Sequence, residues 1–280
     1  MNQAVIGAAS LAAARGVYYA ATMLLFGDLA FNLLLHAKLP VILPPRNVGQ
    51  RWGALAAAAM AGSAWLALTA LGMAGTLDAQ AVTQTVTATL FGQLFLARML
   101  ALLALALVLR RHPRPAALLA LVALALPAAT SHAAASSPAG FTVLGASLDA
   151  LHLATAGFWL GGLAVLLQLH RRNEPNILLA LSLFSEWAMI AVLLLVMTGS
   201  IDAASILLGD PGAPSLLYLA VLGAKLALVA CMLGLAAMNR FRLMPQGRDQ
   251  AIARNAGLEL GTGVIVVLLA GVLGQLQPTL

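Results

Sequence analysis

The chain has 280 residues, of which 62% are hydrophobic and only 9% are charged, and its mean hydropathy is +0.96. A soluble globular domain has about 45–50% apolar and about 25% charged residues, so this composition excludes a soluble protein and indicates an integral membrane protein. The single cysteine, Cys231, excludes a disulfide framework and a cysteine-based metal motif.

The apolar segments follow one another along the whole chain. The first 35 residues lack the basic n-region of a cleavable signal peptide and predict a membrane helix instead. A membrane helix needs about 20 mostly apolar residues. We therefore predict an all-α fold, a polytopic transmembrane bundle of eight helices, with residues 1–280 forming a single integral-membrane domain. The predicted spans are 12–35, 53–75, 86–109, 115–134, 147–169, 178–207, 215–238 and 255–275.

The basic residues predict the orientation of these helices. Twelve of the fifteen lysines and arginines fall in or beside the loops 36–52, 110–114, 170–177 and 239–254. The positive-inside rule places these four loops in the cytoplasm and both termini in the periplasm. The net charge of +6 thus reflects membrane topology, and we expect no nucleic acid as a partner.

Two histidines and an aspartate meet at the predicted outer ends of two helices. Asp149 and His152 are three residues apart and share a helix face, and His132 ends the preceding span at a similar depth. A carboxylate beside an imidazole could supply two metal ligands, a histidine oriented by an acid, or a proton relay. A capping aspartate next to a hydrogen-bonded interfacial histidine is the structural alternative. Imidazole suits copper, zinc, iron and nickel, so these residues alone do not identify the metal.

The sixth predicted span carries Glu186, Met189, Leu193 and Met197 on one side of the helix. Thioether ligands select Cu(I), although methionine is also a common filler of apolar cores. Met197 lies toward the outer end, at the depth of the histidines. If this stripe is functional, Met189 and Glu186 extend it inward as a ladder for an ion.

Other charged residues in the spans could form structural ion pairs or couple transport. Depth along the membrane suggests that Asp28 pairs with Arg98 and that Lys225 pairs with Asp202 or Glu186. We expect Glu259 to lie near the inner end of its span, as a snorkelling acid or paired with Arg254.

Two glycine pairs with GxxxG spacing, Gly157 with Gly161 and Gly257 with Gly261, predict close helix packing.

Several short motifs in the second half of the chain resemble the copper resistance D (CopD) family of bacterial inner-membrane proteins. They are "SHAA" at 131–134, "DALHLATAGFWLGGL" at 149–163, "LFSEWAMIAVLLLVMTGSIDA" at 183–203, "YLAVLGAKLALV" at 218–229, "NRFRLMP" at 239–245 and "RNAGLELGTGVIVVLLAGVLGQLQP" at 254–278. The first half, with "GDLAF" and "ARML", is similar more loosely.

The resemblance implies an eight-helix, multi-pass protein of the bacterial inner membrane that handles a copper ion, commonly beside a periplasmic copper-binding protein of the CopC type. The histidine of the family's "SHAA" falls on His132, and its D-x-x-H falls on Asp149 and His152. We therefore expect copper uptake from periplasm to cytoplasm, with metal contacts from His132, Asp149, His152, Met197, Met189 and Glu186.

Two alternatives to uptake remain open. His152 and His170 lie on one helix face about 27 Å apart, so each could ligate a separate haem b in a membrane redox protein. The chain could also be a scaffold that delivers copper to a partner oxidase. No GxxxxGK[ST], HExxH or GxSxG motif occurs, and we expect a protein that is not an enzyme.

Overall fold

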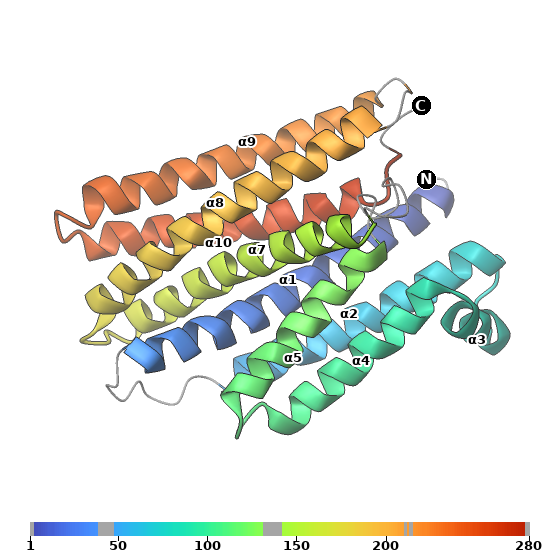
Figure 1. The fold of residues 1–280 in the computed structure, drawn as a ribbon, viewed down its shortest axis with the longest axis horizontal. Coiled ribbons are helices and arrows are strands. Elements are labelled where there is room, and N and C mark those ends of the chain that lie inside the picture. The colour runs from blue at the N-terminus through green and yellow to red at the C-terminus, as the bar shows by residue number, and fades with distance from the viewer. Residues whose placement is uncertain (1–2, 39–47, 131–141, 210–211, 213–214, 278–280) are drawn as a thin grey trace.

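The fold is a bundle of long helices (Figure 1). It is known from a computed structural model that describes residues 3–38, 48–130, 142–209, 212 and 215–277. Those residues contain no strand, and eight of their helical segments are long and apolar enough to cross a membrane. The prediction of an all-α polytopic bundle with eight spans is therefore confirmed. The helices are α1 (Gln3–Lys38), α2 (Val48–Ala74), α3 (Ala79–Ala88), α4 (Leu90–Val108), α5 (Pro113–Ala125), α7 (Thr142–Arg171), α8 (Ile177–Gly209), α9 (Leu216–Met238) and α10 (Asp249–Leu273).

The short helix α3 is absent from the sequence prediction, which placed the third span at 86–109. Asp78 caps α3, because its carboxylate accepts a hydrogen bond from the Ala81 backbone N–H at 2.8 Å. This bond, together with one from the Thr76 hydroxyl, lowers the pKa of Asp78. Thr89 leaves the helical conformation and caps α4 through the Gly92 N–H. The membrane span consequently begins at Leu90, after a separate polar helix.

Helix α1 lies at the centre of the bundle and packs against α2, α5, α7 and α10. Its residues belong to two hydrophobic clusters. Tyr18 and Leu25 face α2, α4 and α5, whereas Phe31 and Leu35 face α7, α8 and α10. The chain therefore builds two half-bundles that share one central helix.

Helices α1 and α7 cross closely because glycine residues face each other at the crossing. A Cβ atom on Gly27 would overlap the carbonyl oxygen of Gly157 and would lie 2.7 Å from the Cα of Gly161. The predicted close packing at Gly157 and Gly161 is thus confirmed. The second pair makes no such close crossing in the described part of the chain, because a Cβ on Gly257 or Gly261 would meet no atom there within 4 Å.

Helices α8 and α9 are neighbours in sequence, yet they barely touch within the described chain. Helix α8 packs against α7, and α9 packs against α10 and the π-helical turn η2 (Asn239–Leu243) that follows it. A cleft lies between α8 and α9, and residues of α7 and α10 also line it. This arrangement positions both polar clusters described below.

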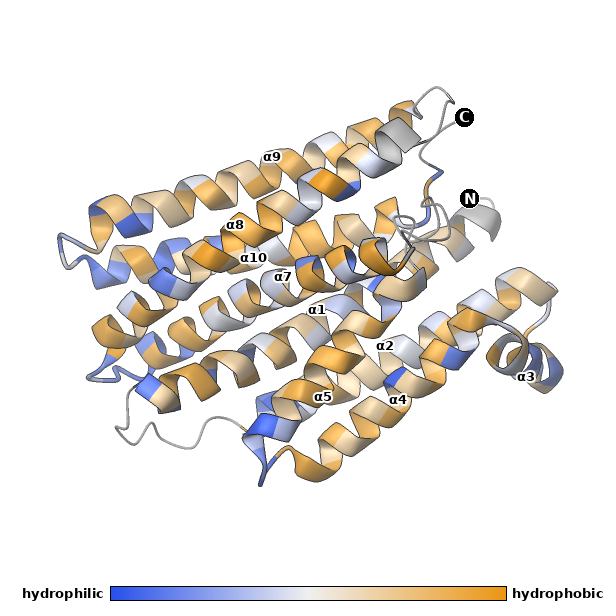
Figure 2. Ribbon diagram, in the orientation of Figure 1, coloured by the Kyte–Doolittle hydropathy of each residue, from blue (hydrophilic) through white to orange (hydrophobic). Residues whose placement is uncertain are grey.

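Both termini lie at one end of the bundle, here called the termini end (Figure 1). The opposite end, here called the basic end, carries hydrophilic residues at the α7–α8, α9–α10 and α4–α5 connections (Figure 2). The positive-inside rule predicts that the basic end is cytoplasmic.

Reporter fusions test this orientation. A reporter that is active only in the periplasm should be active when fused after Leu280 and inactive when fused after Arg172, at the α7–α8 connection. The opposite pattern of activity would reverse the assignment of the two ends.

Candidate functional site

The first candidate site is a polar cluster in the half of the bundle nearest the termini end, here called the outer cluster. It consists of Asp149 and His152 on α7, Thr198 and Asp202 on α8, and Lys225 on α9. The i, i+3 spacing places Asp149 and His152 on one face of α7, as predicted. Helices α7, α8 and α9 therefore all contribute side chains to the outer cluster.

His152 is hydrogen-bonded to α8. Its Nδ1 lies 3.0 Å from the hydroxyl oxygen of Thr198, and that hydroxyl is also 2.8 Å from the Leu194 carbonyl oxygen. In the tautomer in which Nδ1 donates to Thr198, Nε2 keeps a free lone pair, which is the form of histidine that binds a metal ion.

Gly199 allows the imidazole to approach α8. A Cβ atom at this position would lie 3.0 Å from Cε1 of His152, closer than side chains ordinarily pack. The sequence Thr198-Gly199 thus supplies both the hydrogen-bond partner and the space for the ring.

Asp149 and Asp202 form a carboxyl pair across α7 and α8. Their side chains are hydrogen-bonded to each other, which requires a proton on one of them. Lys225 interacts electrostatically with both carboxyl groups and with His152. The electrostatic interaction of Lys225 with Asp202 agrees with one of its two predicted partners, Asp202 or Glu186, but the contact between Asp202 and Asp149 was not predicted. The sequence could have suggested this contact, because Asp202 lies at the same predicted membrane depth as Asp149, on the span that follows it.

The remaining predicted ligands are placed differently. His132 lies outside the described residues. Met197 and Met189 are each about half exposed on α8, and Glu186 is exposed beside them. The side chains of the methionine stripe are exposed on α8, and Met189 also lines a cavity described below. Among the described residues, no three His, Cys, Asp or Glu side chains are grouped so that they could hold a metal ion.

A second polar cluster, here called the inner network, lies toward the basic end. The Asn239 side-chain N–H donates to the Glu259 carboxylate at 2.8 Å, and the Asn255 side-chain N–H donates to Asn239 at 2.9 Å. The Trp159 side chain is also hydrogen-bonded to Glu259. Glu259 is only 2% exposed. The prediction that it snorkels or pairs with Arg254 is therefore wrong.

A cavity of about 210 Å³ opens beside the inner network, within the cleft between α8 and α9. Its walls are mostly apolar and include both Met189 and Met244. Arg240 borders it and donates to the Ser185 carbonyl oxygen at 2.9 Å. Asn239 and Arg240 both belong to the π-helical turn η2, a local geometry that is frequent at functional sites.

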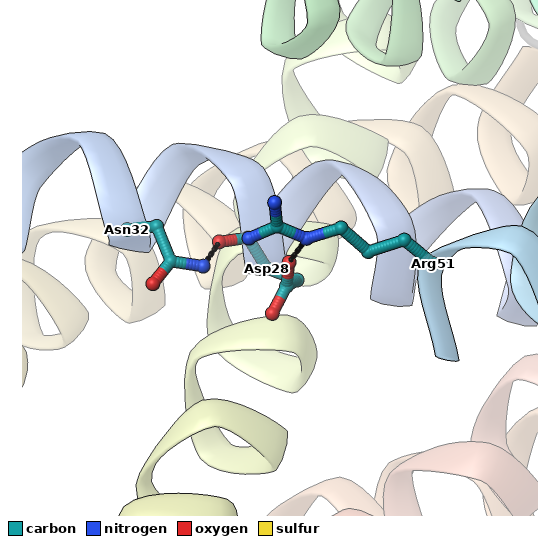
Figure 3. Close-up of polar contacts among 3 residues, drawn as sticks. All are labelled: Asp28, Asn32 and Arg51. Carbon is teal, nitrogen blue, oxygen red and sulfur yellow. Dashed lines mark hydrogen bonds and ion pairs between the residues drawn. The ribbon is translucent and has the colours of Figure 1, made fainter. Parts of the chain in front are cut away.

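Asp28 has a different partner from the one predicted. Its carboxylate accepts a hydrogen bond from Nε of Arg51, near the start of α2, at 2.5 Å (Figure 3). Asn32 donates to the Asp28 backbone carbonyl oxygen one turn further along α1 (Figure 3). This ion pair connects α1 to α2 near the basic end and has a structural role.

Arg98, the partner predicted for Asp28, lies instead among aromatic rings. Its guanidinium is 4.6 Å from the ring centroid of Trp65 and within 6 Å of those of Tyr18, Phe91 and Phe95. Arg98 is 1% exposed, and its Nε and Nη1 atoms have no hydrogen-bond partner in the described structure. Cation–π contacts contribute about 2 kcal/mol when desolvated, and they stabilise this buried charge.

Together, the eight spans and the two polar clusters define a multi-pass α-helical membrane protein with ionisable groups placed at two depths. Residues 178–273 match the family model described as copper resistance protein D, and residues 6–143 match the one described as copper resistance protein D-like, N-terminal domain. The chain belongs to the copper resistance protein D family. It is therefore a multi-pass protein of the bacterial inner membrane that acts in copper resistance or copper handling.

Similarity to a curated relative supports this assignment. The chain is 33% identical to copper resistance protein D of Pseudomonas syringae pv. tomato over 219 aligned residues. The alignment covers 69% of this chain and 70% of that protein. No solved structure matches the chain. Helix α7, with Asp149 and His152, lies almost entirely between the two segments matched by the family models.

Proposed function

We propose that this chain takes up copper from the periplasm into the cytoplasm and that the outer cluster is where the ion is first bound. The observation that carries the proposal is the outer cluster itself, in which Thr198 is hydrogen-bonded to His152, and Asp149, one helical turn from His152, interacts with Asp202 on α8. Imidazole and carboxylate are suitable copper ligands, and His132 is the further ligand that the sequence suggests.

The ionisable groups favour binding of a cation. Residues of this kind in a membrane span are costly and commonly mark an ion pathway. Copper that binds here would compete with Lys225, the cation that now interacts with both carboxyl groups. Transport would be passive or driven by the membrane potential acting on the charge of the ion. We propose no enzymatic step.

A copper donor would complete this function. We propose that a separate periplasmic protein of the CopC type delivers the ion to the outer cluster. Asp149 and His152 are the eighth and eleventh residues of α7, near the membrane face that the positive-inside rule assigns to the periplasm. A donor docked on that face would not need to enter the bilayer.

Metal content and visible absorbance of the purified protein test this proposal. The wild type should carry copper, and the double variant His132→Ala/His152→Ala should lose it, with no Soret band in either sample. Copper that is retained in the double variant would refute the outer cluster as its binding site. A Soret band that disappears in the variant would instead identify the histidines as haem ligands.

A further inference from the structure

The inner network holds a buried carboxylate that has only neutral hydrogen-bond donors. Glu259 accepts from the side chains of Asn239 and Trp159, and Asn255 supports Asn239. In the described structure no lysine or arginine forms an ion pair with Glu259. A buried charge without a counter-charge is costly, and in a membrane span it is a sign of function. The network therefore orients a buried carboxyl group that has no ion-pair partner in the described structure and that a bound cation would stabilise in its charged form.

The surroundings of this carboxylate favour a particular kind of cation. Met189 and Met244 are among the residues that line the adjoining cavity of about 210 Å³, and its other walls are mainly apolar. Thioethers prefer soft ions such as Cu(I). The guanidinium of Arg240, which donates to Ser185, also borders the cavity. A monovalent ion adds one positive charge to these surroundings, whereas a divalent ion would add two at a higher electrostatic cost.

We propose that this cavity is a second, inner site for one Cu(I) ion, with Glu259 as its counter-charge and Met189 and Met244 as its thioether ligands. The inference rests on the proposed uptake function, and it gives the ion a second position along its path. Trp159, which is bonded to Glu259, is seven residues beyond His152 on α7. At 1.5 Å per residue the two sites are separated by about 10 Å along the helix axis.

Cu(I) titration of the purified full-length protein against a chromophoric chelator tests the inner site, with Ag(I) as a redox-inert replacement. The wild type should bind two equivalents, and Glu259→Gln should bind one. Met189→Leu and Met244→Leu should each weaken the second equivalent by about tenfold or more, because each removes a direct ligand. Met60→Leu is the matched control, since Met60 is a 69% exposed methionine on α2, outside the cavity, and it should have no effect.

Three outcomes separate the two sites. Loss of one equivalent in His152→Ala and of the other in Glu259→Gln supports both sites. Loss only in Glu259→Gln supports the inner site and refutes the outer cluster. Wild-type binding of two equivalents in Glu259→Gln and Met189→Leu overturns the inner site. Each variant is first checked for a wild-type thermal unfolding midpoint, and Met189→Leu, which keeps the size of the side chain, provides the test if Glu259→Gln does not fold.

Zn(II) tests the charge argument separately. The inner site should not hold Zn(II) under conditions in which it is filled by Cu(I) or Ag(I). Equal occupancy by Zn(II), lost in Glu259→Gln, would overturn the assignment of a monovalent ion.

Discussion

Replacement of Gly27 by leucine should prevent accumulation of the folded protein. A side chain at this position would overlap the carbonyl oxygen of Gly157 and lie 2.7 Å from the Cα of Gly161. Both are backbone atoms, so α1 and α7 would have to separate. Overpacking of a core usually costs about 1–3 kcal/mol, and a clash between two backbones exceeds this range because no side-chain rotation relieves it. The yield of monodisperse protein and its thermal unfolding midpoint in detergent measure the effect.

The second glycine pair provides the matched control. Gly261→Leu makes the same chemical change in α10, where a Cβ would meet no atom within 4 Å. It should leave both yield and unfolding midpoint close to those of the wild type. Equal behaviour of Gly27→Leu and Gly261→Leu would show that the α1–α7 crossing is not made by these glycines.

Replacement of His152 by alanine should lower the copper affinity of the outer cluster by about tenfold or more, because it removes a direct ligand. Loss of a group that only hydrogen-bonds to a ligand already lowers metal affinity by about tenfold. His170→Ala is the internal control. His170 lies on the same helix, five turns away at the basic end, and its removal should not change copper binding. Competition with a chelator of known affinity measures both variants.

Met197→Leu refines this result. If Met197 completes the outer site, the variant should weaken Cu(I) more than Cu(II), since thioether prefers the softer ion. Met197 is 51% exposed and Thr198, next to it, holds His152. An equal loss for both oxidation states would assign Met197 to packing. An unchanged copper affinity in His152→Ala would refute the outer site itself.

The spans could be predicted because their length and apolar composition follow directly from the thickness of a bilayer. The partners of the charged residues could not be predicted in the same way. Sequence gives the depth of a residue along the membrane normal, but not its position around the bundle. We therefore predicted an ion pair between Asp28 and Arg98, which have opposite charges. In the structure, Asp28 forms its ion pair with Arg51, near the start of α2.

The same limit explains the inner network and the glycine pairs. Glu259 lies close in sequence to Arg254, but α10 turns its carboxyl group toward Trp159 and Asn239. The GxxxG spacing occurs at more than one place in the chain, and close packing also needs a small residue on the facing helix. Gly27 provides it for the first pair. The sequence alone does not reveal which helix will be opposite.

The central position of α1 has a consequence for biosynthesis. Helix α1 is synthesised before α2, α5, α7 and α10, the helices that pack against it. Each of these spans can therefore dock as it leaves the translocation machinery, onto a surface that is already in the bilayer, and domains generally fold as units in the order of their synthesis. The half-bundle of α2, α4 and α5 is complete before α7 is made. The half-bundle of α7 to α10, which contains both proposed copper sites, is therefore added to helices that have already packed together.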